Sequence, residues 1–134
     1  MSARYILAVD QGTTGTTVLV LGHDCAVRGR AYSEFSQSYP HPGWVEHDAS
    51  EIWAVSHRVM AQALGDADID ASDLAAVGIT NQRETTLLWD RASGEPVAPA
   101  IVWQDRRTAS ITEELRGAGH EDLVRRKTGL VLDP

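Results

Sequence analysis

The residues from Tyr5 to Leu21, with the sequence YILAVDQGTTGTTVLVL, decide the fold of this protein. They contain an apolar run, a glycine-marked turn from Gln11 to Gly15, and a β-branched apolar run from Thr16 to Leu21. A second turn follows, and then a mixed strand-like stretch from Ala26 to Phe35. The alternation of strand and turn predicts an antiparallel meander of three strands.

The next element is predicted to be an amphipathic helix from Ala49 to Leu64, because its apolar residues recur at helical spacing. Asp48 precedes Glu51 by three residues, which resembles a capping box, and Gly65 is a plausible C-terminal cap. Asp48 is better explained as this cap than as a metal ligand, because the acids and histidines nearby lack metal-ligand spacing.

The rest of the chain mixes short strands and helices. Strands or extended runs are predicted at Leu74–Thr80, which we expect to be buried, at Thr85–Trp89 and at Pro99–Trp103, and helices at Thr108–Arg116 and Glu121–Lys127. This order suits an α/β domain with a mixed sheet. It does not suit a Rossmann unit, in which a helix directly follows the first strand.

Bulk composition narrows the functional classes. The 134 residues fit one domain, and 43% hydrophobic with 23% charged residues argue against disorder. A net charge of -7 disfavours a nucleic-acid partner. Cys25 is the only cysteine, so no intrachain disulfide is possible, which suits a reducing cytoplasm. No apolar run approaches membrane-spanning length.

The turn after the first strand is a candidate phosphate site. Gly12 and Gly15 permit unusual backbone conformations, and successive N–H groups with the hydroxyls of Thr13 and Thr14 could bind an anion. Asp10 is placed where a carboxylate would suit Mg2+. The spacing matches neither a P-loop nor a dinucleotide fingerprint, and an ordinary tight hairpin turn is an equally good explanation.

Two further polar clusters follow apolar runs. Arg83 offers only donors and Glu84 only acceptors, so together they could bind a polyol hydroxyl. Trp103 could form an apolar wall for a small molecule. The alternatives are a solvated loop with a surface ion pair at Arg83 and Glu84, and a core tryptophan at Trp103. Asp105, followed by two arginines, most often indicates a structural ion pair.

Together these clusters resemble the FGGY carbohydrate kinases, and within that family the members that phosphorylate glycerol. The matching stretches cover almost the whole chain in family order: Asp10–Thr14, Gly43–Asp48, Ile79–Thr85, Ala100–Arg107 and Lys127–Leu130. The resemblance implies a ribonuclease H-like (actin and sugar-kinase) fold of two domains around a cleft. Residues 1–134 would be the N-terminal part of the first domain.

On the nucleotide side, the resemblance implies that ATP and Mg2+ are the cofactors. Asp10 would face the Mg2+ through water, and the turn of Gly12, Thr13 and Thr14 would contact the phosphates. The chain departs from the pattern at Thr17, where these family members commonly carry an arginine that helps to hold phosphate. Thr17 cannot supply that charge.

On the acceptor side, the resemblance implies that Arg83 and Glu84 hydrogen-bond glycerol hydroxyls and that Trp103 packs on the carbon skeleton. The base that takes the hydroxyl proton, a further glycerol-contacting tyrosine and the adenosine pocket are expected beyond Pro134. The parent is expected to be a cytoplasmic homo-oligomer, a dimer or tetramer, and the isolated chain is expected to be inactive.

Three other functions remain open from the residues. One is a kinase of another small polyol or sugar with the same turn. A second is a non-catalytic ligand-binding or regulatory domain, which the missing arginine and missing base favour. A third is an actin-like filament module, which would not need polar side chains suited to a polyol at Arg83 and Glu84.

Overall fold

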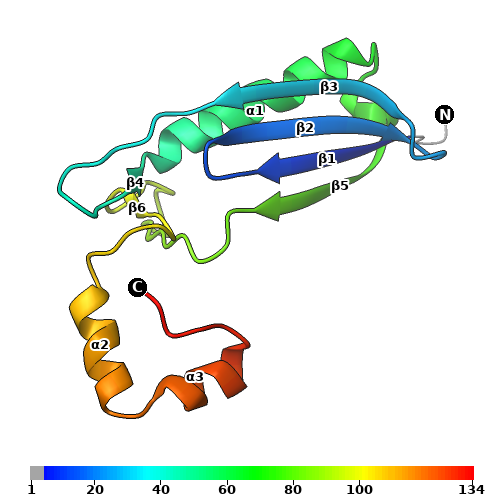
Figure 1. Cartoon of the computed structure of the whole chain (residues 1–134). Coiled ribbons are helices and arrows are strands. Elements are labelled where there is room, and N and C mark those ends of the chain that lie inside the picture. Colours follow the sequence, from blue (N-terminus) through cyan, green and yellow to red (C-terminus); the bar gives the residue numbers. More distant parts are fainter. Residues whose placement is uncertain (1–4) are drawn as a thin grey trace.

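A four-stranded mixed sheet forms the centre of the molecule in the computed structural model, which describes residues 5–134. The strands are β1 (Tyr5–Gln11), β2 (Gly15–Gly22), β3 (Val27–Glu34) and β5 (Leu74–Asn81), in the order β3-β2-β1-β5 (Figure 1). Strands β1, β2 and β3 pair antiparallel, and β5 joins β1 in parallel. The predicted meander and mixed sheet are therefore confirmed.

Helix α1 (Ala49–Asp66) covers one face of this sheet (Figure 1). Alternate residues of β1 and β2 point toward the helix and form one core, whose buried members are Leu7, Val9, Val18, Val20, Phe35, Val55, Val59 and Ala63. Within this core Thr16 Oγ1 and Ser56 Oγ form a buried hydrogen bond of 3.1 Å. The bond joins β2 to α1 and leaves neither hydroxyl unsatisfied.

The ends of α1 differ in detail from the prediction. Asp48 is the N-cap, and its carboxylate accepts from the backbone N–H of Glu51 at 3.3 Å. The capping box is incomplete, because Glu51 accepts from the N–H and hydroxyl of Ser36 instead of turning back to Asp48. Gly65 lies inside the helix, which continues until Ala67 caps it.

Strand β5 is present where expected, but the prediction that it is buried is wrong. The side chains of Val77 and Ile79 are 52% and 73% exposed. The reason is geometric: β5 is the edge strand, while α1 lies over β1, β2 and β3. The apolar composition of β5 therefore does not correspond to burial within residues 5–134.

The predicted strand Thr85–Trp89 is also wrong, since this segment forms only isolated bridges, Thr86 with Ile101 and Trp89 with Pro96. Its available partner β6 (Ala100–Ile101) is two residues long and pairs with β4 (Glu46–His47). So short a partner cannot support a continuous ladder. A single 3-10 turn, η1 (Ala71–Asp73), precedes β5.

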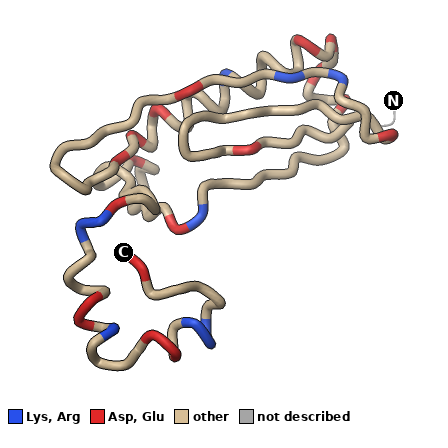
Figure 2. Tube along the Cα trace, in the orientation of Figure 1, with Lys and Arg blue, Asp and Glu red and all other residues tan. Residues whose placement is uncertain are grey.

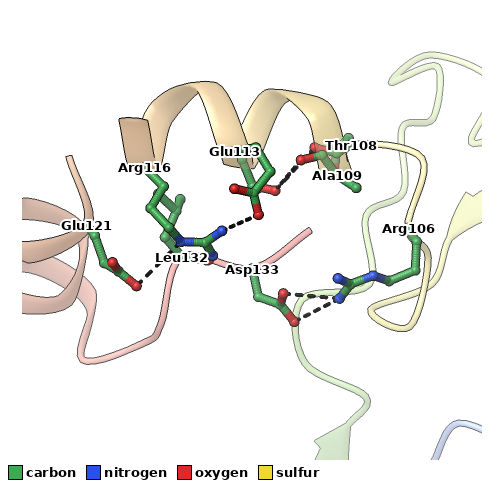
Figure 3. Close-up of polar contacts among 9 residues, drawn as sticks. Arg106, Thr108, Ala109, Glu113, Arg116, Glu121, Leu132 and Asp133 are labelled. Atoms are coloured by element: carbon green, nitrogen blue, oxygen red, sulfur yellow. Dashed lines mark hydrogen bonds and ion pairs between the residues drawn. The ribbon is translucent and has the colours of Figure 1, made fainter. Parts of the chain in front are cut away.

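Helices α2 (Ala109–Gly117) and α3 (Glu121–Thr128) confirm the two predicted C-terminal helices, and they lie away from the sheet (Figure 1). None of the residues of α3 is buried. Polar contacts hold the terminal segment: Arg106 binds Asp133 at 3.0 and 3.1 Å, and Arg116 donates to the carbonyl of Leu132 at 2.6 Å (Figure 3).

Charged residues of both signs are spread along the trace, with acidic residues in the majority (Figure 2). The acidic majority does not favour a nucleic-acid partner, which needs a clustered positive charge. Across the same residues, no helix combines the length and apolar character needed to cross a membrane.

Candidate functional site

The candidate phosphate turn, Gly12–Thr14, connects β1 to β2. The N–H of Gly12 donates to the carbonyl of Gly15 at 3.0 Å, which closes the turn. The backbone N–H groups of Thr13 and Thr14 donate to no acceptor within residues 5–134. They are two adjacent free donors of the kind that bind anions.

The glycines of this turn have a different role from the one expected. Neither Gly12 nor Gly15 has a positive φ, so unusual backbone conformation is not their function. Gly15 is required by close packing, because a Cβ there would lie 2.6 Å from the carbonyl oxygen of Ser33 and 2.8 Å from the ring of Tyr32. The turn is therefore held by steric fit against β3.

Asp10 lies at the end of β1, next to the turn, and its side chain is exposed. In the sheet register it pairs with Thr17 of β2 on one side and Thr80 of β5 on the other. A carboxylate with hydroxyl groups on neighbouring strands suits a hydrated Mg2+, which prefers oxygen ligands and keeps several waters. Within residues 5–134 no three His, Cys, Asp or Glu side chains form a metal cluster, so protein ligands would be few.

Trp103 contacts the candidate phosphate turn directly. Its indole Nε1–H donates to Thr13 Oγ1 at 2.9 Å, although the two residues are 90 positions apart in the sequence. The side chain is 49% exposed, so Trp103 is not a core tryptophan. It lines a pocket of about 460 Å³ together with Glu84 and with the tail residues Asp133 and Pro134.

Arg83 and Glu84 follow β5, and both side chains are exposed. Neither forms an ion pair within residues 5–134, so the surface ion pair considered above is absent there. Glu84 faces the pocket with Trp103, whereas Arg83 is not among the lining residues. Glu84 also has φ 62°, a left-handed conformation that costs energy for a residue with a side chain.

Sequence reasoning missed a buried polar network, which consists of Gln37, His47, Gln82 and Thr85. His47 is 1% and Gln82 is 9% exposed. Their hydrogen bonds connect the loop before α1 with the segment after β5. The sequence did contain a signal for this network. Gln37, His47 and Gln82 are polar residues next to predicted strands and the predicted helix, where buried side chains are common.

The ring of His47 is neutral in this environment. Burial lowers its pKa below the ordinary value of 6.5, while the charge of Glu51 acts in the opposite direction. The edge of the ring meets Phe35, with the two ring centroids 5.0 Å apart. His47 is therefore a core residue with both ring nitrogens bonded, and not a metal ligand.

A separate cluster of charged residues, Asp105, Arg107 and Glu46, lies next to the pocket, and Asp105 is one of the residues that line it. Burial alone would raise the pKa of Asp105, but hydrogen bonds from Arg107 and from the N–H of Val45 outweigh it and lower the pKa to about 2. Arg107 also binds Glu46 at 2.8 Å and stacks on Trp44 at 3.7 Å. The expected structural ion pair of Asp105 is thus with Arg107.

This arrangement defines a class of protein. A mixed sheet in the order β3-β2-β1-β5, with α1 on one face and free N–H groups after the first strand, is the actin and ribonuclease H-like fold of sugar kinases. A crystal structure of Plasmodium falciparum glycerol kinase with ADP matches 98% of this chain and 26% of its own, with a TM-score of 0.84 and 31% identity. A xylulose kinase from Rhodospirillum rubrum matches 91% of this chain and 25% of its own, with a TM-score of 0.79 and 27% identity.

The chain belongs to the FGGY family of carbohydrate kinases, because the model of that family's N-terminal domain matches residues 5–134. A curated relative from Rhodopirellula baltica, a glycerol kinase, is 56% identical over 133 residues. The match covers 99% of this chain and 25% of the relative. The chain thus spans about a quarter of the length of the relatives it matches.

Proposed function

We propose that the protein containing this chain transfers the γ-phosphoryl group of ATP to glycerol, forming glycerol 3-phosphate. The observation that carries the proposal is the 2.9 Å hydrogen bond between Trp103 and Thr13. This bond joins Trp103, which lines the pocket with Glu84, to a residue of the turn whose backbone N–H is free. It supports a site in which an acceptor hydroxyl and a phosphate would meet. The name of the relative from Rhodopirellula baltica supports glycerol as the acceptor.

On the nucleotide side, the N–H groups of Thr13 and Thr14 would donate to phosphate oxygens. The carboxylate of Asp10 would hold the water shell of Mg2+, which offsets phosphate charge when it is bound. Phosphoryl transfer depends mainly on positioning and charge neutralisation, and these residues would supply part of both.

On the acceptor side, the carboxylate of Glu84 would accept a hydrogen bond from a glycerol hydroxyl, and the guanidinium of Arg83 would donate to another. The indole of Trp103 would pack against the carbon skeleton. Because Arg83 does not line the pocket in the structure, it would have to turn toward the ligand. The base that accepts the hydroxyl proton would come from outside this chain.

Several properties of the parent belong to the same proposal. Residues 1–134 would be the N-terminal part of the first kinase domain, with the second domain, the base and the adenosine pocket outside this chain. The parent would be a cytoplasmic homo-oligomer, a dimer or tetramer. The domain boundaries in this proposal are supported by the family membership and by the quarter of the relatives' length that the chain spans.

The experiment is an assay of ADP release by the full-length protein, with glycerol, xylulose and gluconate as acceptors. Glycerol should give the highest kcat/KM. Glu84→Gln should raise the KM for glycerol, and Arg83→Ala should do the same, whereas the exposed Arg91→Ala is the matched control and should not. Higher kcat/KM with a sugar would favour the second candidate, a sugar kinase, which the likeness to xylulose kinase supports. The isolated 134-residue chain is expected to show no turnover.

A further inference from the structure

Two hydrogen-bonded routes connect Trp103 with Thr13. The first is the direct bond from the indole Nε1–H to Thr13 Oγ1. The second leads from the backbone N–H of Trp103 through the buried polar network to the backbone carbonyl of Thr13. The two routes start at the wall of the pocket and end on the same residue of the phosphate turn, so they form a closed ring.

The first half of the second route has a defined direction. The N–H of Trp103 donates to Thr85 Oγ1 at 3.3 Å, and the Thr85 hydroxyl donates to Gln82 Oε1 at 3.0 Å. Because Gln82 Oε1 accepts, its amide nitrogen faces the other way and donates toward His47 Nδ1 at 3.4 Å. The same nitrogen also lies 3.4 Å from Gln11 Oε1 and 3.5 Å from the carbonyl oxygen of Gly12, so Gln82 contacts the phosphate turn directly as well.

The second half fixes the proton on His47. Gln37 Nε2 donates to the carbonyl of Thr13 at 3.0 Å, so Gln37 Oε1 is the acceptor for His47 Nε2 at 2.6 Å. His47 must then carry its proton on Nε2 and accept at Nδ1. A proton added at Nδ1 would face the amide N–H groups of Gln82 and would break the route there.

The direct bond also has a consequence for Thr13. Its hydroxyl oxygen accepts from the indole, and its own proton remains available to donate. That proton lies beside the free N–H groups of Thr13 and Thr14. Trp103 therefore orients a third donor of the phosphate turn.

We propose that Gln37, His47, Gln82 and Thr85 are positioning residues that couple the polyol pocket to the phosphate turn. A ligand packed on the indole would fix Trp103, and the ring would fix Thr13 for phosphate. Binding at either place would then lower the conformational cost of binding at the other. This coupling rests on the proposed function, whereas the ring itself does not.

The ring can be tested on the chain alone by 15N NMR. The Trp103 indole resonance, assigned with Trp103→Phe, should move to the position of an exposed indole in Thr13→Val. Thr14→Val is the matched control, because the Thr14 hydroxyl has no partner within residues 5–134. An unchanged indole resonance in Thr13→Val would overturn the direct route.

Titration from pH 8 to pH 5 tests the second route. The carboxylate of Glu51 acts on the His47 ring, while Gln37, Gln82 and Phe35 carry no charge. Glu46, Asp48 and Glu95 line a pocket with His47, and Glu46 is paired with Arg107. Below pH 6.5 the backbone amide of Trp103 should shift as His47 gains a proton. His47→Gln, which keeps a donor and an acceptor, should abolish this shift, and the exposed His57→Gln should retain it. A shift that persists in His47→Gln would contradict the route.

The coupling is tested in the full-length protein as the ratio of the ADP Kd without and with saturating glycerol. We expect a ratio of about 5 or more, falling near 1 in Thr85→Val and restored in Thr85→Ser. Thr128→Val, at an exposed position of α3 that does not line the pocket, is the control and should keep the original ratio. An unchanged ratio in Thr85→Val would refute the coupling while leaving the proposed function intact. If the full-length protein bound neither ADP nor glycerol, both the coupling and the proposed function would be refuted. The NMR experiments on the ring would not be affected by that result.

Discussion

Asp105 is the residue whose charge matters most to the stability of the fold around the pocket. Its side chain is 2% exposed, and it accepts from Val45 N–H at 2.7 Å and from Arg107 Nη2 at 2.8 Å. Asp105→Asn should lower the free energy of unfolding by about 2 kcal/mol, because it removes the charge of a buried acceptor and leaves Arg107 with Glu46 as its remaining acidic partner within residues 5–134. Urea unfolding at pH 7 measures this, with the exposed Asp122→Asn as the control that should change little.

The same carboxylate predicts a specific pH dependence. Its folded pKa of about 2 lies below the ordinary value of 3.8, so its contribution is fully present above pH 4 and is lost as the pH falls toward 2. The contribution should be about 2 kcal/mol, and Asp105→Asn should lack it. Stability curves of the two proteins that remain parallel between pH 5 and pH 2.5 would contradict this assignment.

Glu84 combines a strained backbone with a proposed role in glycerol binding. Its φ of 62° lies in the left-handed region, which glycine adopts without the strain that a glutamate side chain causes. Glu84→Gly should therefore raise the free energy of unfolding by about 1 kcal/mol while it abolishes glycerol binding in the full-length protein. Glu84→Gln keeps the strained backbone and should leave stability unchanged. Thermal unfolding and calorimetric titration separate the two effects, and a lower melting temperature for Glu84→Gly would contradict the strain.

Thr17 marks the position where the chain lacks a positive charge near the turn. It pairs with Asp10 in the β1–β2 register, at the level where phosphate is expected to lie. Thr17→Arg should tighten ADP binding by the full-length protein about tenfold, because a charge-assisted hydrogen bond to phosphate is gained. Thr17→Gln adds length without charge and should leave the Kd unchanged. Equal affinities for the Arg and Gln variants would exclude a role of charge here.

At the scale of elements, the contact of α1 with β3 depends on Gly29. A Cβ at this position would lie 2.5 Å from the carbonyl oxygen of Ala63 and 2.7 Å from the N–H nitrogen of Ala67. Gly29→Ala should lower the free energy of unfolding by about 2 kcal/mol, because the helix must move away from the sheet. Gly65→Ala, inside α1 with open space around it, should instead raise it by about 1 kcal/mol. Urea unfolding of both variants checks the opposite signs.

Comparing the elements one by one shows which of them could be predicted from sequence patterns alone. The meander and α1 were predictable because period-two and helical spacing each bury one face within the same short stretch. Burial of β5 was not, since its apolar residues resemble a buried strand whether or not anything within residues 5–134 covers them. The segment Thr85–Trp89 failed for a related reason: a strand needs a partner edge, and pairing partners are not visible in local composition.

The candidate site was also predictable only in part. Thr13 and Glu84 follow the neighbouring parallel strands β1 and β5, so a correct topology would predict that they lie at the same edge of the sheet. Trp103 follows β6 of the separate two-stranded sheet, and its position would not follow from that topology. The contact of Trp103 with Thr13 and the buried polar network do not follow, because hydrogen bonds between residues 35 to 90 positions apart depend on side-chain geometry.

At the scale of the whole molecule, stability should be uneven. The core of β1, β2, β3 and α1 is buried, whereas α3 has no buried residue and α2 buries only Thr112. Backbone amides of α3 should therefore exchange with deuterium orders of magnitude faster than those of β1 and β2.

Asp133→Asn removes the ion pair with Arg106 and should increase exchange across residues 109–134 by up to about fivefold, since exposed ion pairs contribute at most about 1 kcal/mol. Asp24→Asn, which removes an exposed ion pair in the β2–β3 turn, should leave exchange in that segment unchanged. If Asp133→Asn also accelerated exchange in α1, the terminal helices and the core would unfold together as one cooperative unit, contrary to this expectation.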